Sequence, residues 1–138
     1  YYTDGLPDPA DPLHRRPRFK GLLEYRRSLR RLRERSLRAI LPGFGGVIER
    51  PDRAIREALL FYEVRIQRIE RSLRSVSALG QAVTAWEIWR ALFPGADPAT
   101  EMRTRLLTII GALDVLEDIG ACATERRADG VLVHRHAS

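Results

Sequence analysis

Few side chains in this sequence could bind a metal ion or act as a nucleophile. The histidines are His14, His134 and His136, and the only cysteine is Cys122. His134 and His136 lie two residues apart in a predicted strand, so both would point to the same face, as two metal ligands do. No third ligand accompanies them, and Cys122 lies beside apolar residues, where we expect a buried, unreactive thiol. Neither a Ser/His/Asp nor a Cys/His arrangement is indicated, and we assign no catalytic or metal-binding residue to this chain.

Arginine offers a different chemistry. The chain has 24 lysines and arginines against 18 carboxylates, a formal net charge of +6. Eleven basic residues and two carboxylates fall within 15–38, whereas residues 81–138 hold six arginines and eight carboxylates. Guanidinium groups bind phosphates through two parallel hydrogen bonds, so these arginines could hold RNA phosphates or the acidic arm of a cofactor. The alternative is a solvated, arginine-rich face. The candidate phosphate or nucleic-acid contacts are Arg26, Arg27, Arg30, Arg31, Arg103, Arg105, Arg126 and Arg127.

Two amphipathic helices are predicted in the N-terminal half. Residues 1–18 are rich in Pro and Asp, which indicates an irregular lead-in. Apolar residues at three- and four-residue spacing predict an arginine-covered helix over 20–35. A short strand over 36–41 and a Pro/Gly-rich turn over 42–46 follow it. The spacing then predicts a helix over 52–76 whose apolar seam we expect to pack on the rest of the chain; a homodimer through that seam is the alternative. The seam consists of Ile55, Leu59, Tyr62, Ile66, Ile69, Leu73 and Val76.

The C-terminal half predicts a helix-turn-helix followed by a β-hairpin. Thr84 can cap the first helix, and Glu87 three residues later completes a capping box. The Pro/Gly-rich segment 94–98 separates the two helices, and a turn over 128–130 joins two strands. The predicted elements are a helix over 85–93, a helix from Thr100 to Gly120, and strands over 121–126 and 131–136.

Two features of this half could contact nucleic acid. Trp86 and Trp89 lie three residues apart and could stack bases, but tryptophans at helical spacing more often pack a core. The outer face predicted for the long helix begins with basic residues and ends with acidic ones, which would repel phosphates. These residues are Arg103, Arg105, Asp114, Glu117 and Asp118. We therefore expect a role in packing, substrate gating or subunit contacts rather than direct binding of nucleic acid.

The order of these motifs resembles the C-terminal part of metallo-β-lactamase-fold hydrolases. The run from Thr84 to Gly95, together with the helix end at 113–120, resembles their C-terminal winged helix. This resemblance points to the branch that includes the β-lactamase-like protein 2 endoribonucleases. Upstream, the arginine-rich stretch 25–32 and the sequence Ile-Leu-Pro-Gly-Phe-Gly at 40–45 are similar to that fold's last helix, strand and metal-ligand loop. The resemblance spans about residues 11–138.

Two departures from the family pattern shape what the resemblance implies. The family's main zinc cluster, His-x-His-x-Asp-His, belongs to the N-terminal half of the fold and is absent from this sequence. The family loop reads Leu-Pro-Gly-His-Gly, and its histidine binds the second metal. Here Phe44 occupies that position, and a phenyl ring has no lone pair to give to zinc. Zinc is thus implied for intact relatives, and this chain is expected to bind no cofactor.

These observations predict a mostly helical α+β chain with three parts. Residues 1–50 would be the remnant of a metallo-β-lactamase fold, 51–77 a connecting helix, and 78–138 a winged helix. The chain begins at Tyr1, so we expect a fragment whose partner is the missing N-terminal half of such a hydrolase. No stretch suits a membrane span, and the single cysteine fits a cytoplasmic protein. The alternative function is a basic nucleic-acid-binding module acting through the arginine-rich helix and the wing.

Overall fold

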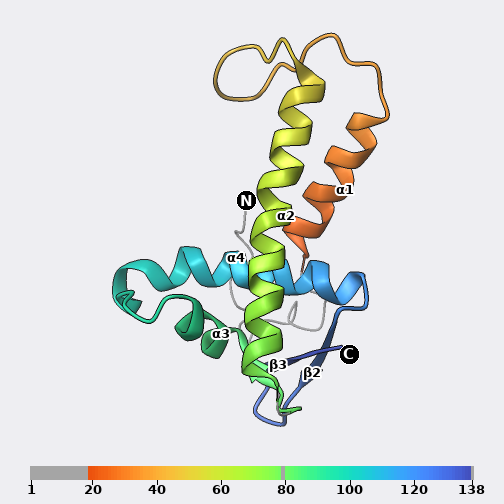
Figure 1. Ribbon diagram of the computed structural model, residues 1–138. Helices are drawn as coiled ribbons and strands as arrows, with labels where there is room; N and C mark the ends of the chain where they lie inside the picture. Colours follow the sequence, from red (N-terminus) through yellow and green to blue (C-terminus); the bar gives the residue numbers. More distant parts are fainter. Residues whose placement is uncertain (1–18, 79, 138) are drawn as a thin grey trace, which may run out of the picture.

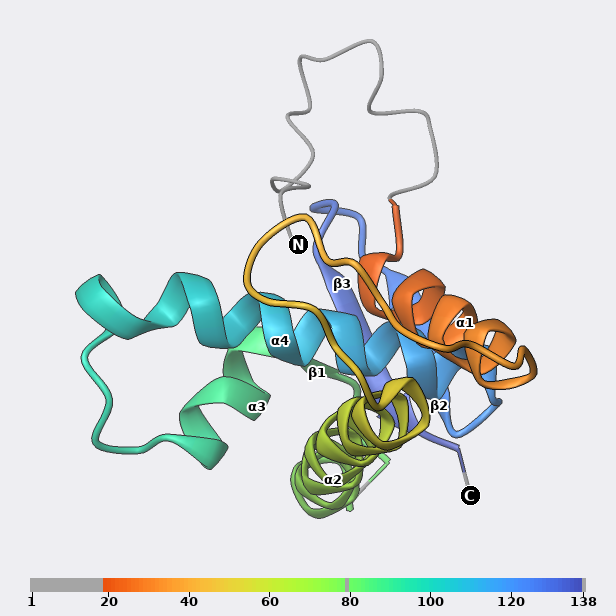
Figure 2. The same cartoon turned by 90° about the horizontal axis from the view of Figure 1, so that it is seen from above.

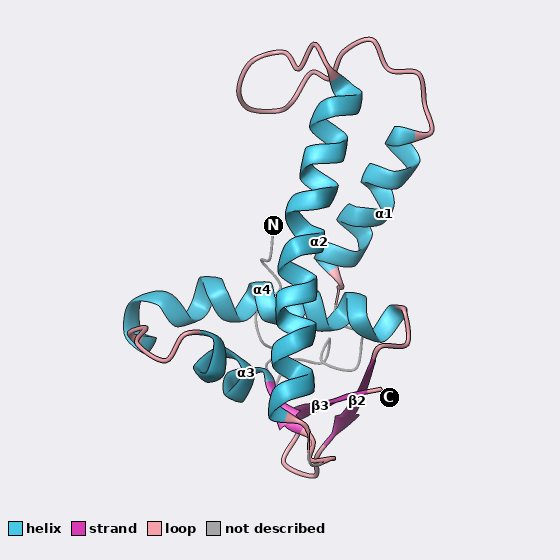
Figure 3. Cartoon of the chain, viewed as in Figure 1, coloured by secondary structure: helices cyan, strands magenta, loops and turns pink. Residues whose placement is uncertain are grey.

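The computed structural model describes residues 19–78 and 80–137, which form a mostly helical α+β fold (Figure 1; Figure 3). The predicted lead-in over 1–18, including His14, lies outside the described residues. The elements are α1 (Gly21–Arg33), α2 (Pro51–Val76), β1 (Val83–Thr84), α3 (Ala85–Leu92), α4 (Pro98–Asp118), β2 (Cys122–Arg126) and β3 (Leu132–His136).

The two amphipathic helices of the N-terminal half form as their apolar spacing predicts. Leu22, Leu23 and Leu29 are buried on one side of α1. Pro51 stands in the first turn of α2, where its missing N–H costs no hydrogen bond. The last hydrogen bond of the helix runs from the N–H of Ser77 to the carbonyl of Leu73. In the described part of the chain, no helix is long and apolar enough to cross a membrane.

The strand predicted over 36–41 is wrong. Within that segment only Ile40 pairs with another backbone segment, and it does so through an isolated antiparallel bridge with Ile48. The Pro/Gly-rich turn between them brings the two isoleucines together. No further strand in the described residues lies beside this pair to extend it into a sheet. The connection between α1 and α2 is therefore a loop closed by one bridge, at the end of the molecule remote from the sheet (Figure 1).

Side-chain caps fix the starts of α3 and α4. The hydroxyl of Thr84 accepts from the N–H of Glu87 at 3.2 Å, and the Glu87 carboxylate accepts from the N–H of Thr84 at 2.7 Å. This is the predicted capping box. Helix α4 begins at Pro98, two residues before the predicted start, because the Asp97 carboxylate accepts from the N–H of Ala99. It ends before Gly120, whose positive φ of 76° suits glycine.

The three strands form one antiparallel sheet in the order β1-β3-β2. The hairpin of β2 and β3 pairs Thr124 with His134, and the two residues of β1 add to the other edge of β3. Gly130, with φ of 84°, lies in the turn that the sequence predicted. The sheet lies at the end of the molecule opposite the 34–50 connection (Figure 3).

One core joins all the layers. Helix α4 packs against α1, α2, α3 and β2, and Figure 2 shows it crossing beside α2. Most of the seam of α2 faces this core, as expected. The core also takes in residues of α1, so apolar contacts cross the sequence divisions at 50/51 and 77/78. Its buried members are Leu22, Leu23, Ile66, Ile69, Leu73, Val83, Ile88, Trp89, Ile109, Ala112, Leu113, Val115, Leu116 and Cys122.

The two leucines Leu73 and Leu60 on α2 allow a matched test of this core. Leu73 is fully buried, whereas Leu60 is 64% exposed. Leu73→Ala should lower the free energy of unfolding by about 2–5 kcal/mol, because it removes buried methyl groups and leaves a cavity. Leu60→Ala, the same chemical change, should cost less than about 0.5 kcal/mol. Urea unfolding followed by circular dichroism measures both, and equal losses would contradict this packing.

The capping box predicts a pH dependence of stability. The N–H and hydroxyl of Thr84 donate to the Glu87 carboxylate and lower its pKa. A carboxyl whose pKa is lowered in the folded state stabilises the fold above its ordinary pKa, and this contribution disappears as the pH falls through the folded value. Glu87→Gln should therefore lower the melting temperature at about pH 7 but not at about pH 2, where both side chains are neutral. A gap between the two proteins that persists at low pH would contradict this.

Candidate functional site

The loop that resembles a metal-ligand loop is exposed at one end of the molecule. The N–H groups of Ile40 and Ile48 donate to each other's carbonyls at 3.0 and 2.9 Å, which closes the loop. Gly45 adopts a φ of 88°, a conformation that favours glycine. Phe44 is 93% exposed. Its ring thus extends into solvent and provides no donor atom at the position where the family pattern has histidine.

Other candidate metal ligands are not brought together. Within the described ranges, no three His, Cys, Asp or Glu side chains lie close enough to hold a metal ion. His134 is buried, and its Nδ1 lies 3.1 Å from the hydroxyl of Thr124. His136 contacts Arg74 and Glu70, with Nε2 3.5 Å from a carboxylate oxygen. Both imidazoles therefore have protein partners.

Cys122 is the buried thiol that the sequence suggested. It begins β2 and belongs to the core. Burial raises its pKa above the ordinary value, against the weaker opposing effect of hydrogen bonds. The sulfur is thus protonated at neutral pH, and a protonated thiol is a poor nucleophile.

Arg26 is used inside the fold rather than presented to a ligand. Arg26 is only 6% exposed. Its Nη2 donates to a carboxylate oxygen of Glu63 at 2.6 Å, which joins α1 to α2. Burial lowers the pKa of Arg26, and the charge of Glu63 acts in the opposite direction. A phosphate could reach this guanidinium only by displacing Glu63.

The acidic end of α4 also engages α1. Arg27 donates to Glu24 and to Asp118, both at 2.7 Å, and Lys20 pairs with Glu117. Sequence reasoning placed Asp114 on an outer face as well. That prediction is wrong, because Asp114 is 5% exposed in a helix covered on several sides.

The remaining predicted arginines are scattered over the molecule. Arg105 pairs with Glu101, and its guanidinium lies 4.3 Å from the ring centre of Phe93. In the hairpin, Arg126 donates to the carbonyl of Gly130, and Arg127 pairs with Asp129. Nothing is described of the Arg103 side chain. Arg30 and Arg31 are exposed on α1, where Arg31 donates to the Ser28 hydroxyl. The predicted contacts therefore do not form one site.

The two tryptophans stack on each other. Their ring centres are 4.9 Å apart with an angle of 26° between the planes. Trp89 is fully buried in the core, as expected, whereas Trp86 is partly exposed. Only Trp86 has a face that another ring could reach.

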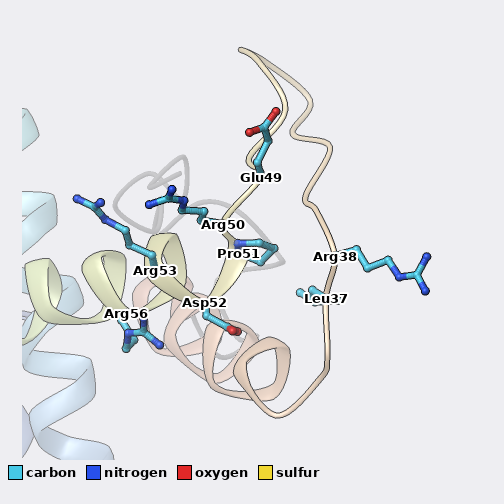
Figure 4. A pocket seen from close by; sticks show the side chains of 8 residues that line it. All are labelled: Leu37, Arg38, Glu49, Arg50, Pro51, Asp52, Arg53 and Arg56. Atoms are coloured by element: carbon cyan, nitrogen blue, oxygen red, sulfur yellow. The ribbon is translucent and has the colours of Figure 1, made fainter.

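Sequence reasoning missed a group of arginines at the start of α2. A shallow depression lies between residues 37–38 and the first turns of this helix (Figure 4). The spacing of Arg50, Arg53 and Arg56, each three residues apart, was a signal for one basic face. The residues lining the depression are Leu37, Arg38, Glu49, Arg50, Pro51, Asp52, Arg53 and Arg56.

Solved structures resemble the fold of this chain. A β-lactamase domain protein from Burkholderia ambifaria is 18% identical, with a TM-score of 0.61, over 86% of this chain and 34% of that one. A metallo-β-lactamase family protein from Thermus thermophilus is 23% identical, with a TM-score of 0.53, over 83% and 33%. No protein-family model and no curated protein sequence matches the chain. The fold is therefore similar to part of metallo-β-lactamase-fold proteins, and the chain spans about a third of their length.

The Arg26–Glu63 pair can be tested against an exposed pair on the same helix. Glu63→Gln should lower the free energy of unfolding by about 1–3 kcal/mol, because the buried Arg26 charge loses its counter-charge. Glu57→Gln removes the carboxylate from the exposed Arg53–Glu57 pair and should change stability little. Chemical unfolding of both variants is the measurement. If Glu57→Gln proved the more damaging change, the assigned role of Arg26 would be wrong.

Proposed function

We propose that this chain is the C-terminal part of a metallo-β-lactamase-like hydrolase and does not itself hold the catalytic metals. The single observation that carries this proposal is the structural similarity to one third of two longer proteins of that fold. The glycine-rich loop at 42–46 lies in a connection closed by the Ile40–Ile48 bridge, which suits a loop held at the edge of a site. The part that we assign to the chain is packing and the formation of site walls.

The C-terminal residues 78–138 are proposed to be a winged helix of this hydrolase. The order β1, α3, α4, β2, β3, with β1 added to the edge of the hairpin, supports this assignment. In DNA-binding helix-turn-helix domains, the second helix enters the major groove. Helix α4 would be that helix here, but α1 packs against it and pairs with its acidic end. An internal packing role therefore suits it better than reading DNA.

The outer face of α2 is the proposed contact with the rest of the hydrolase. Leu60, Phe61 and Val64 are each at least half exposed, although they are large and apolar. Their spacing places them together on the helix, on a different face from the buried seam. Exposed apolar groups of this kind commonly mark a protein contact. About two thirds of each similar structure has no counterpart in this chain, and we propose that the corresponding part of the hydrolase covers this face.

The residues of this chain do not fit a metal centre by themselves. In an intact hydrolase, paired zinc ions lower the pKa of bound water and polarise the bond that is cleaved. Phe44 has no donor atom, and the described ranges hold no cluster of three ligands. The second zinc position of the proposed parent would therefore lack one ligand.

The missing ligand leads to a direct test. The coding sequence upstream of Tyr1 should be determined and the longer product expressed, with Phe44→His and Phe19→His as matched variants. Phe44→His should raise the bound zinc by about one ion per chain, because it restores a ligand beside the other metal site. Phe19→His, at an exposed position before α1, should leave the zinc content unchanged. Zinc content is read by mass spectrometry of the metal.

Two results would overturn the proposed function. The first is an upstream sequence that lacks the His-x-His-x-Asp-His cluster or does not exist. The second is turnover with a metal held by residues 1–138 alone.

A further inference from the structure

We propose that the end of the molecule remote from the sheet binds the phosphate backbone of a nucleic acid. This end comprises the last turn of α1, the connection over 34–50 and the first turns of α2, which Figure 1 shows meeting above the rest of the fold. We call it the arginine end. The inference does not depend on the proposed hydrolase, since it concerns a surface that this chain carries alone.

The arginine end holds most of the net charge of the chain. Between residues 30 and 57 there are eight arginines and four carboxylates, which leaves a formal charge of +4, whereas the whole sequence has +6. The carboxylates are Glu34, Glu49, Asp52 and Glu57. The arginines are Arg30, Arg31, Arg33, Arg35, Arg38, Arg50, Arg53 and Arg56.

Most of these arginines have no partner within the described residues. Arg53 pairs with Glu57 at 2.7 Å, and Arg31 donates to Ser28. The other six are exposed, and within the described part of the chain their side chains take part in no hydrogen bond, ion pair or ring contact. By contrast, Arg26 and Arg27 on the same helix α1 are both paired with carboxylates. The positive charge of the arginine end is thus not neutralised locally, and it attracts anions.

The geometry favours an extended anion over a small one. Figure 4 shows the side chains of Arg38, Arg50 and Arg56 pointing in different directions around the shallow depression, not converging into it. A single phosphate or carboxylate could therefore meet only one or two of them at once. A polymer with a negative charge at each repeat can meet several. Because guanidinium groups bind phosphate oxygens in pairs, a nucleic-acid backbone suits this surface.

Other basic positions are poorer candidates. Helix α4 is covered by α1 along its acidic end. In the hairpin, Arg127 pairs with Asp129 and Arg135 with Glu125, so these charges are largely balanced. The nucleic-acid contacts would then lie at the arginine end, whereas the sequence alone had spread them over α1, α4 and the hairpin.

Fluorescence anisotropy with labelled single-stranded RNA and duplex DNA of mixed sequence tests the proposal on the 138-residue chain. The test variant replaces Arg35, Arg38, Arg50 and Arg56 by Gln. The matched control loses the same charge at exposed arginines elsewhere, and its substitutions are Arg68→Gln, Arg71→Gln, Arg90→Gln and Arg126→Gln. Circular dichroism confirms that both variants fold. Poly-glutamate, a polyanion without phosphate, serves as the competitor.

The wild-type chain should bind at least one of the two nucleic acids at about 0.15 M salt. The test variant should bind it at least about tenfold more weakly, and its slope of log affinity against log salt should be shallower by about 3, since each lost phosphate contact removes about 0.7–0.9. The control should lose less than about threefold. Equal losses in both variants, no binding at this salt, or equally strong competition by poly-glutamate would overturn the proposal. None of these results bears on the zinc content of the longer product.

Discussion

The burial of the second half of α4 is the constraint on which the described fold depends. Residues 109 and 111–116 are all buried, so this stretch is covered on more than one side. Helices α1, α2 and α3 and strand β2 supply that cover. At about 25 cal/mol per Å² of apolar surface, packing of this kind is the main source of stability in a chain of this size. The loops and the charged surfaces are positioned by it.

The same packing sets the electrostatics of α1. Acidic residues at the C-terminal end of a helix are unfavourable, because the helix dipole is negative there. Glu117 and Asp118 occupy this position in α4. Glu117 pairs with Lys20, which is the N-cap residue of α1, and Asp118 pairs with Arg27 of α1. Burial raises the pKa of Glu117, but the hydrogen bond and charge of Lys20 outweigh it, and the net pKa is lowered. The basic side chains in the first half of α1 are therefore used in contacts within the fold. The unpaired positive charge lies at the other end of this helix.

Apolar and basic side chains are exposed in neighbouring parts of the described chain. Phe44 in the 42–46 loop and the apolar group on α2 are open to solvent, although both are expensive to hydrate. Phe44 lies within the arginine end, and the apolar group begins at Leu60, further along α2. The two proposed partners are the rest of the hydrolase and a nucleic acid, and they would contact different residues. The rest of the hydrolase would contact the apolar side chains, and the nucleic acid would contact the guanidinium groups.

The sequence by itself determined the local elements. Apolar spacing predicted both long helices, Thr84 with Glu87 predicted the capping box, and the chemistry of Phe44 excluded a metal ligand, because these depend only on neighbouring residues. Tertiary structure decided the rest. It left residues 36–41 without a strand partner, buried Asp114, and paired Arg27 with a carboxylate 91 positions away. Helical periodicity fixes the face on which a charge lies, but only the packing of distant elements decides whether that charge meets a partner or solvent.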